Sequence, residues 1–240
     1  MARRGPLPPC GGCALATRLA LRLTTCIGIT MAAEPRLCVF AKAPELGRVK
    51  TRLARHLGAA AACRAHEALV AHVLDRLAGC ALTKELWVAG NAGHPQVAVW
   101  SQRLGALVRV QPQGDLGDRM HAAVSACCAA GQPALIVGSD LPEIDVPYIE
   151  RAAAALTAHD LVLGPVEDGG YGLVGLKAPA PLLFRGIAWS TPTVLAETRS
   201  RADQLRLSVA ELPTTWDVDG IDEWRRFQAL GGQAAARSAS

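Results

Sequence analysis

The sequence contains no apolar run long enough to cross a membrane. A spanning helix needs about twenty consecutive apolar residues. The apolar stretch near the N-terminus is interrupted by Arg18 and Arg22. The same two arginines break the continuous apolar segment that a secretory signal peptide requires. We therefore expect neither a membrane partner nor export, and the cytoplasm is the default location.

The body of the chain also lacks an excess of charge of either sign. The 240 residues include 25 basic and 21 acidic ones, which gives a formal net charge of +4. Residues 1–30 contain four arginines and no acid, so the remaining 21 basic residues balance the 21 acidic ones. Domains that bind nucleic acid usually present a strongly basic face to the phosphates. A neutral body therefore predicts no nucleic-acid partner.

No cysteine pattern of a zinc finger or a disulfide framework is present. Cys10 and Cys13 form a C-x-x-C pair, but no second pair follows at finger spacing. Cys38, Cys63 and Cys80 lie in apolar surroundings and are expected to be small core residues. Reduced thiols agree with an intracellular setting.

The chain is expected to hold one folded domain over residues 36–230, a length that suits a single domain. Residues 1–33 are predicted to be a disordered leader or to precede the true start of translation, because Met31 lies just before the first strand-like segment. A basic leader without acids also fits an organelle-targeting peptide. Residues 231–240 are expected to form a disordered tail. No heptad or repeat is present, so the oligomeric state stays open.

What the sequence does contain is a regular alternation of strand-like and helix-like segments. Short apolar runs occur at 37–41, 86–89, 107–110, 134–137, 161–163, 171–176 and 207–209. Helical spacing of apolar residues occurs at 49–78, 97–104, 120–130, 148–156, 193–201 and 221–230. This order predicts an α/β fold, a Rossmann-like three-layer αβα sandwich with a mostly parallel sheet. Ligands of such sheets bind beyond the carboxyl ends of the strands.

A basic loop follows the first predicted strand. Lys42, Arg48, Lys50 and Arg52 fall within eleven positions and lead into a helix N-terminus. Backbone N–H groups at a helix start favour an anion, and lysine or arginine adds charge-assisted bonds to phosphate. The loop has neither a P-loop motif nor a G-x-G-x-x-G fingerprint. A phosphate site and an ordinary solvated loop are both open interpretations.

An acid follows the apolar strand at 134–137. Asp140 lies in the motif GSDLP at 138–142, and Asp217 and Asp219 precede the last helix. Carboxylates at a sheet edge can hold Mg²⁺ or Mn²⁺ beside a diphosphate, since both ions prefer oxygen ligands. The alternative interpretation is that these acids only cap turns or helices.

Two other loops carry polar residues after strands. After the fifth strand, Asp168 is followed by Gly169, Gly170 and Tyr171. A tight hairpin turn explains the glycines but not the acid beside the tyrosine. Arg119 lies beyond the third strand, where it is available to a base, a ribose or an acceptor. The six histidines form no motif, and no role is assigned to them.

Taken together, these motifs resemble the DUF2064 family. The matching segments lie at 40–44, 50–53, 138–142, 164–171, 189–191 and 217–219, and they keep their order over about residues 36–230. The family is glycosyltransferase-like and is associated with radical SAM proteins and arsenosugar biosynthesis. It is similar to the nucleotide-diphospho-sugar transferase superfamily, which has the GT-A fold and includes molybdenum-cofactor and 2-phospho-lactate guanylyltransferases.

The resemblance implies a role for each group of residues. The basic loop would bind nucleotide phosphates, Asp140 with Asp217 or Asp219 would hold Mg²⁺ or Mn²⁺, and Asp168 would be the acceptor-side or catalytic acid. The implied activity is metal-dependent glycosyl transfer from a nucleotide sugar to a small-molecule acceptor. The alternatives are a nucleotidyltransferase that consumes an NTP and releases pyrophosphate, and a non-catalytic nucleotide-sugar binder. The first loop lacks the Gly-rich start and the R-x-G-x-x-K pattern of the guanylyltransferases, which counts against nucleotidyl transfer.

Overall fold

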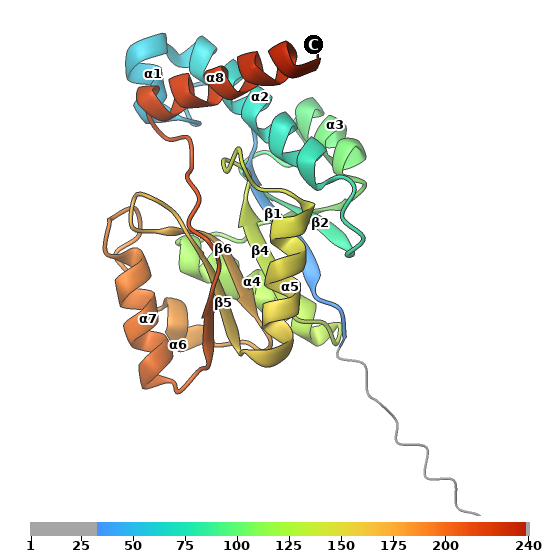
Figure 1. Cartoon of the computed structure of the whole chain (residues 1–240), viewed down its shortest axis with the longest axis vertical. Coiled ribbons are helices and arrows are strands. Elements are labelled where there is room, and N and C mark those ends of the chain that lie inside the picture. The colour runs from blue at the N-terminus through green and yellow to red at the C-terminus, as the bar shows by residue number, and fades with distance from the viewer. Residues whose placement is uncertain (1–32, 239–240) are drawn as a thin grey trace, which may run out of the picture. The chain divides into compact units, whose positions relative to one another are not determined.

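The computed structural model describes residues 33–238, which form seven strands and eight helices around one sheet (Figure 1). The strands are β1 (Arg36–Lys42), β2 (Lys84–Ala89), β3 (Leu107–Val110), β4 (Ala134–Gly138), β5 (Leu161–Pro165), β6 (Tyr171–Leu176) and β7 (Val209–Glu211). The helices are α1 (Thr51–Leu57), α2 (Ala59–Leu77), α3 (Pro95–Leu104), α4 (Leu116–Ala129), α5 (Val146–Ala158), α6 (Pro181–Phe184), α7 (Val194–Gln204) and α8 (Ile221–Ser238).

The sheet is mostly parallel, as the alternation of segments predicts. Its strand order is β3-β2-β1-β4-β6-β5-β7, with β1 paired in parallel to β2 on one side and to β4 on the other. Only β6 runs antiparallel to its neighbours β4 and β5. A short connection at 166–170 joins β5 to β6, and a connection of that length allows a hairpin but no parallel crossover.

Two apolar layers cover the sheet, so the predicted three-layer α/β sandwich is confirmed. On β1, Leu37 and Val39 face one core, which α2, α3 and α5 complete. Cys38 and Phe40 face the other core, which is completed by α4, α6 and α7. Successive side chains of a strand point to opposite faces, and both faces of β1 are buried. This burial explains why the strand reads as a continuous apolar run.

Besides shifted ends, as in β7 (predicted at 207–209) and α4 (predicted at 120–130), the structure differs from the predicted elements at three places. The single helix expected over 49–78 is divided into α1 and α2 at Gly58, whose φ of 79° is left-handed. Glycine adopts this conformation at little cost, so the helix changes direction there. The short helix α6 was not predicted, because four residues contain too little periodicity to detect. Helix α8 continues to Ser238, whereas a disordered tail was expected from 231.

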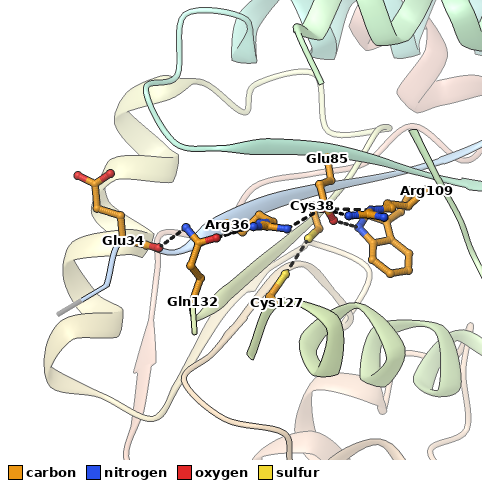
Figure 2. A network of polar contacts seen from close by, with 8 residues as sticks. Glu34, Arg36, Cys38, Glu85, Arg109, Cys127 and Gln132 are labelled. Atoms are coloured by element: carbon orange, nitrogen blue, oxygen red, sulfur yellow. Dashed lines mark hydrogen bonds and ion pairs between the residues drawn. The ribbon is translucent and has the colours of Figure 1, made fainter. Parts of the chain in front are cut away.

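Near the amino ends of the strands, Glu85 of β2 is buried with a complete set of partners. Its Oε1 atom accepts from Arg36 at 2.7 Å and from Arg109 at 3.1 Å, and its Oε2 atom accepts from Trp87 Nε1 at 2.9 Å. Figure 2 shows Glu85 between the two arginines, with Gln132 on the far side of Arg36. Both carboxylate oxygens are therefore occupied. We call this group the Glu85 network.

Two thiols lie directly beside the Glu85 network. Cys38 Sγ of β1 is 3.5 Å from Cys127 Sγ of α4, and both side chains are fully buried (Figure 2). Cys38, Cys63 and Cys80 are all buried, in agreement with the prediction that they are core residues. Cys10 and Cys13 lie outside the described residues, as do residues 1–32 of the leader predicted over 1–33. None of the helices in the described part of the chain combines the length and hydropathy needed to cross a membrane.

Candidate functional site

A cavity of about 640 Å³ opens at the carboxyl ends of β1 and β4, where the parallel fold predicts a ligand site. The volume is in the range of pockets that bind cofactors and small molecules. The cavity is lined by residues of the basic loop, of the loops that follow β4 and β5, and of the segment before α8. These lining residues include Lys42, Arg48, Lys50, Arg52, Asp140, Asp168, Gly170, Tyr171, Asp217 and Asp219.

The backbone before α8 brings two distant acids to the end of β4. Val218 N donates to Asp140 O at 3.0 Å, which fixes this extended segment against the strand end. Trp216 and Val218 are both 1% exposed and pack in the interior. Alternate residues of an extended segment point in opposite directions. Asp217 and Asp219 therefore face the cavity.

The three acids form a cluster with the chemistry of a divalent metal site. One carboxylate oxygen from each of Asp140, Asp217 and Asp219 lies within 4.8 Å of the other two. Oxygens bound to one Mg²⁺ or Mn²⁺ at about 2.1 Å lie at most roughly 4.2 Å apart, so small rotations bring all three into range. Gly138 makes room for this arrangement, because a Cβ there would lie 2.8 Å from an Asp140 oxygen. The predicted ligand set fits a divalent ion. We call it the acid cluster.

Lys50 lies inside the acid cluster. Its Nζ atom is 3.0 Å from Asp140 Oδ2 and 3.2 Å from Asp219 Oδ1, and its side chain is only 9% exposed. The residue precedes α1 with a φ of 44° and a ψ of 49°, a left-handed conformation that is unfavourable for a side chain with a Cβ. The sequence predicts Lys50 as a phosphate ligand, whereas in the structure its direct partners are carboxylates.

These contacts stabilise the charged forms of both partners. Burial favours the neutral forms, but the neighbouring opposite charges outweigh it. Accordingly, the pKa of Lys50 is raised by Asp140 and Asp219, and the Lys50 ammonium holds the pKa of Asp140 below its ordinary value. The ion pair is therefore fully charged at neutral pH.

Asp217 has the opposite electrostatic environment. Burial, followed by the charges of Asp140, Asp219 and Asp168, raises the pKa of Asp217 from 3.8 to about 7. No lysine or arginine of the described residues lies within ion-pair distance of it. The acid cluster thus has more negative charge than the neighbouring cations offset. A site of this kind is suited to take up a further cation.

The other cations of the basic loop are more exposed than Lys50. Arg52 pairs with Asp219 at 3.2 Å and remains 58% exposed, and Arg48 pairs with Glu45 at 3.2 Å. Lys42 Nζ lies 3.4 Å from the Arg48 carbonyl oxygen at the cavity. These long side chains are free to turn toward a ligand phosphate, because exposed ion pairs hold them only weakly.

Two residues of α2 hold the basic loop in place, and neither is among the site residues predicted from the sequence. His66 Nε2 hydrogen-bonds to the Lys42 carbonyl oxygen at 2.9 Å, and Cys63 Sγ donates to the Pro44 carbonyl oxygen at 3.3 Å. His66 is 5% exposed and lines the cavity. Burial lowers the pKa of His66. The sequence could have indicated only that these residues are buried, because positions 63, 66 and 70 share the buried face of the helix.

Asp168 lies at the cavity in the tight turn between β5 and β6. Its Oδ1 atom accepts from Gly170 N at 2.8 Å, while the side chain remains exposed. Gly170 and Tyr171 also line the cavity, but Gly169 does not. Gly169 has a φ of 88°, and a Cβ there would lie 2.3 Å from the Pro192 carbonyl oxygen. Its role in the structure is to shape the turn.

Arg119 does not line the cavity, unlike Leu116 and Met120 of the same helix α4. Those two residues lie one turn apart and face the cavity, whereas Arg119 Nε is buried elsewhere without a hydrogen-bond partner. Leu116 and Met120 belong to an apolar wall that also includes Tyr171 and Trp189, whose rings are in edge contact with centroids 6.5 Å apart. The cavity therefore has one charged end and one apolar wall.

Comparisons with known proteins agree with this fold. The model of the DUF2064 family, described as an uncharacterised protein conserved in bacteria, matches residues 73–191. A solved structure from Desulfovibrio desulfuricans, described as a candidate nucleotide-diphospho-sugar transferase, is 30% identical with a TM-score of 0.71. The match covers 78% of this chain and 83% of that chain. The fold and these relatives define a transferase of the nucleotide-sugar type. The chain belongs to the DUF2064 family within the nucleotide-diphospho-sugar transferases.

More distant structures share the fold alone. The 4-diphosphocytidyl-2C-methyl-D-erythritol synthase of Anaerococcus prevotii is 8% identical with a TM-score of 0.56, over 83% of this chain and 96% of that chain. The glucosyl-3-phosphoglycerate synthase of Mycobacterium tuberculosis, solved with Mn²⁺, UDP and glucosyl-3-phosphoglycerate, is 15% identical with a TM-score of 0.50, over 82% and 76%. A search of the curated proteins found no match.

Proposed function

We propose that the protein is a metal-dependent glycosyltransferase that uses a nucleotide-sugar donor and a small-molecule acceptor. The observation that carries this proposal is the acid cluster, which lies at the carboxyl edge of the sheet beside the basic loop. Without a cation between them, the acids would repel a diphosphate. With a divalent cation, carboxylates and phosphates can be ligands of one ion.

The donor diphosphate would lie between the acid cluster and the basic loop. Lys42, Arg48 and Arg52 line the cavity and would offset the phosphate charge with charge-assisted hydrogen bonds. A bound Mg²⁺ or Mn²⁺ would act as a Lewis acid that stabilises the charge on the leaving nucleoside diphosphate. The mycobacterial enzyme of the same fold, solved with Mn²⁺ and UDP, supports this assignment by analogy.

The acceptor would lie along the apolar wall on the other side of the diphosphate. Asp168 is exposed at the cavity, and one of its oxygens makes no hydrogen bond within the turn. This oxygen would orient the acceptor hydroxyl or take its proton during transfer. Trp189 and Tyr171 offer ring faces and edges against which a sugar or another compact group can pack.

A thermal-shift screen of nucleotides and nucleotide sugars, with and without Mn²⁺, identifies the donor, because a ligand of the native state raises the melting temperature. Asp140→Ala is then expected to weaken Mn²⁺-dependent donor binding by about 100-fold in calorimetry, since binding to the ion and its carboxylate is lost together. Glu150→Ala, on the exposed surface of α5, is the matched control and should bind like the wild type. Unchanged donor binding in Asp140→Ala would refute the proposal.

The products of turnover separate the remaining alternatives. Glycosyl transfer releases a nucleoside diphosphate from a nucleotide sugar, whereas nucleotidyl transfer releases pyrophosphate from an NTP. We expect Asp168→Asn to bind the donor normally and to lose about 100-fold in transfer rate, the usual contribution of a general base. Pyrophosphate release from GTP or CTP with a phosphorylated acceptor would favour the nucleotidyltransferase. Tight donor binding with no turnover for any acceptor would favour a non-catalytic binder.

A further inference from the structure

We infer that Lys50 is a built-in counter-ion that neutralises the acid cluster in the free protein and moves to the diphosphate when the metal and donor bind. The inference rests on the proposed function, since it concerns how that site is filled. It gives Lys50 two successive sets of partners. The structure shows the first set, and a bound diphosphate would supply the second.

The geometry places Lys50 where a bound cation would be. Its ammonium bridges Asp140 and Asp219, two of the three candidate metal ligands, at 3.0 and 3.2 Å. A divalent ion on the same carboxylates would lie within a few ångströms of this ammonium and repel it. Metal binding and the present Lys50 contacts therefore compete for the same two carboxylates. One of the two cations must move.

The backbone around Lys50 is anchored, while its side chain can change partners. Val49 is 3% exposed and Leu53 is 1% exposed, so the residues on both sides of the left-handed position are fixed in the interior. The long lysine stem contains four rotatable bonds and ends in a point charge with three donors. Lys50 also lines the cavity in which a diphosphate would lie. A rotation of the stem can carry the ammonium from carboxylate to phosphate.

The charges of the site couple metal binding to nucleotide binding. The acid cluster offers three carboxylates, and the cations within ion-pair distance are Lys50 and the exposed Arg52. A metal ion alone must displace Lys50 and leave its ammonium without a partner. A nucleoside diphosphate supplies a new anionic partner for Lys50. We therefore expect Mn²⁺ to bind weakly alone and much more tightly with a nucleoside diphosphate.

The test measures Mn²⁺ binding without nucleotide, by electron paramagnetic resonance of the free ion. Lys50→Met should bind Mn²⁺ about tenfold more tightly than the wild type, in the range of ordinary coupling between two sites. Arg52→Met is the matched control, because it also removes a cation next to Asp219 but an exposed one, and it should change the affinity by less than about threefold. Equal or weaker Mn²⁺ binding in Lys50→Met overturns the inference.

A second comparison covers the case in which Lys50→Met does not fold without metal. Adding Asp217→Asn removes one of the uncompensated charges, and the double variant is then compared with Asp217→Asn alone. The double variant should still bind Mn²⁺ more tightly, and no gain would overturn the inference. Because these titrations contain no nucleotide, they do not depend on turnover. Normal Mn²⁺-dependent donor binding by the wild type, with no gain in Lys50→Met, would refute the counter-ion role and leave the proposed function standing.

Discussion

The two ends of the sheet carry buried charge in opposite ways. Near the amino ends, Glu85 is a single carboxylate shared by Arg36 and Arg109, with Trp87 Nε1 on its second oxygen. At the carboxyl ends, the acid cluster has three carboxylates, one buried lysine and one exposed arginine. The Glu85 network is complete within the chain. The acid cluster, when Asp217 is ionised, has one carboxylate more than it has cations paired with it.

This difference shows that residue type and distance do not by themselves define a metal site. Cys38, Glu85 and Cys127 also place three possible ligand atoms within 4.8 Å of one another. Their carboxylate, however, already has partners on both oxygens, and two arginines lie beside it. An added cation would have to displace those arginines. Charge left without a partner, as at Asp217, is the better indicator of a binding site.

The largest expected effect on stability comes from removing the central acid of the Glu85 network. Glu85→Ala leaves Arg36 and the Trp87 N–H without their buried partner, and breaking such a network costs about 3 kcal/mol in the free energy of unfolding. Urea unfolding followed by circular dichroism measures this loss, with Glu150→Ala as the control. Mn²⁺-dependent donor binding by the folded variant should be unchanged. A loss below about 1 kcal/mol would show that the Glu85 network is not structural.

A smaller effect of opposite sign is expected at the acid cluster. Asp217→Asn should stabilise the metal-free protein by about 1–2 kcal/mol at pH 8 in the presence of a chelator, because it removes a charge that the fold disfavours. The same variant should bind Mn²⁺ more weakly but still measurably, because Asp140 and Asp219 remain. Destabilisation at pH 8 would contradict the surplus of negative charge in the acid cluster.

The pH dependence of stability gives an independent check of this prediction. The pKa of Asp217 is raised to about 7 in the folded protein, so the folded state takes up a proton that the unfolded chain binds only near pH 4. This group therefore stabilises the metal-free fold progressively as the pH falls from about 8 to about 5. The Asp217→Asn variant lacks this titrating carboxyl, so its free energy of unfolding should change less between pH 8 and pH 5. Identical pH profiles of the two proteins would be the contrary result.

The smallest effect is expected at the rim of the Glu85 network. Arg109 is 49% exposed, and Glu85 keeps Arg36 and Trp87 when Arg109 is removed. Arg109→Met should therefore cost less than about 1 kcal/mol, the usual range of an exposed ion pair. A loss as large as that of Glu85→Ala would mean that the two arginines are equally necessary, and the same unfolding experiment decides between these results.

The positions of the strands and the edge that holds the site could be predicted from the sequence for a physical reason. Both faces of β1, β2, β4 and β5 are buried, so these strands read as apolar runs, and polar residues directly after them must lie at the sheet edge. Asp140 after β4 and Asp168 after β5 follow from this rule. The change of helix direction at Gly58 could not be predicted, because the residues on both sides of it have helical spacing.

The contacts within the site could not be predicted from the sequence in the same way. Lys50 reaches the acid cluster from a left-handed backbone position, which no local pattern around this lysine indicates. His66 supports the basic loop through its side chain, and its sequence neighbourhood reads as an ordinary amphipathic helix. Arg119 was predicted at the site from its loop, but the rotation of α4 directs Leu116 and Met120 to the cavity instead. For all three residues, the sequence does not indicate the direction in which the side chain points.

Diffraction from crystals grown with Mn²⁺ and a nucleoside diphosphate, recorded for the anomalous signal of manganese, tests the central claim directly. We predict one anomalous peak within about 2.5 Å of oxygens of Asp140 and of at least one of Asp217 and Asp219. The ammonium of Lys50 should then contact phosphate, and no peak should lie at the Glu85 network. A peak bound away from Asp140, or no peak with the diphosphate in place, would contradict the account.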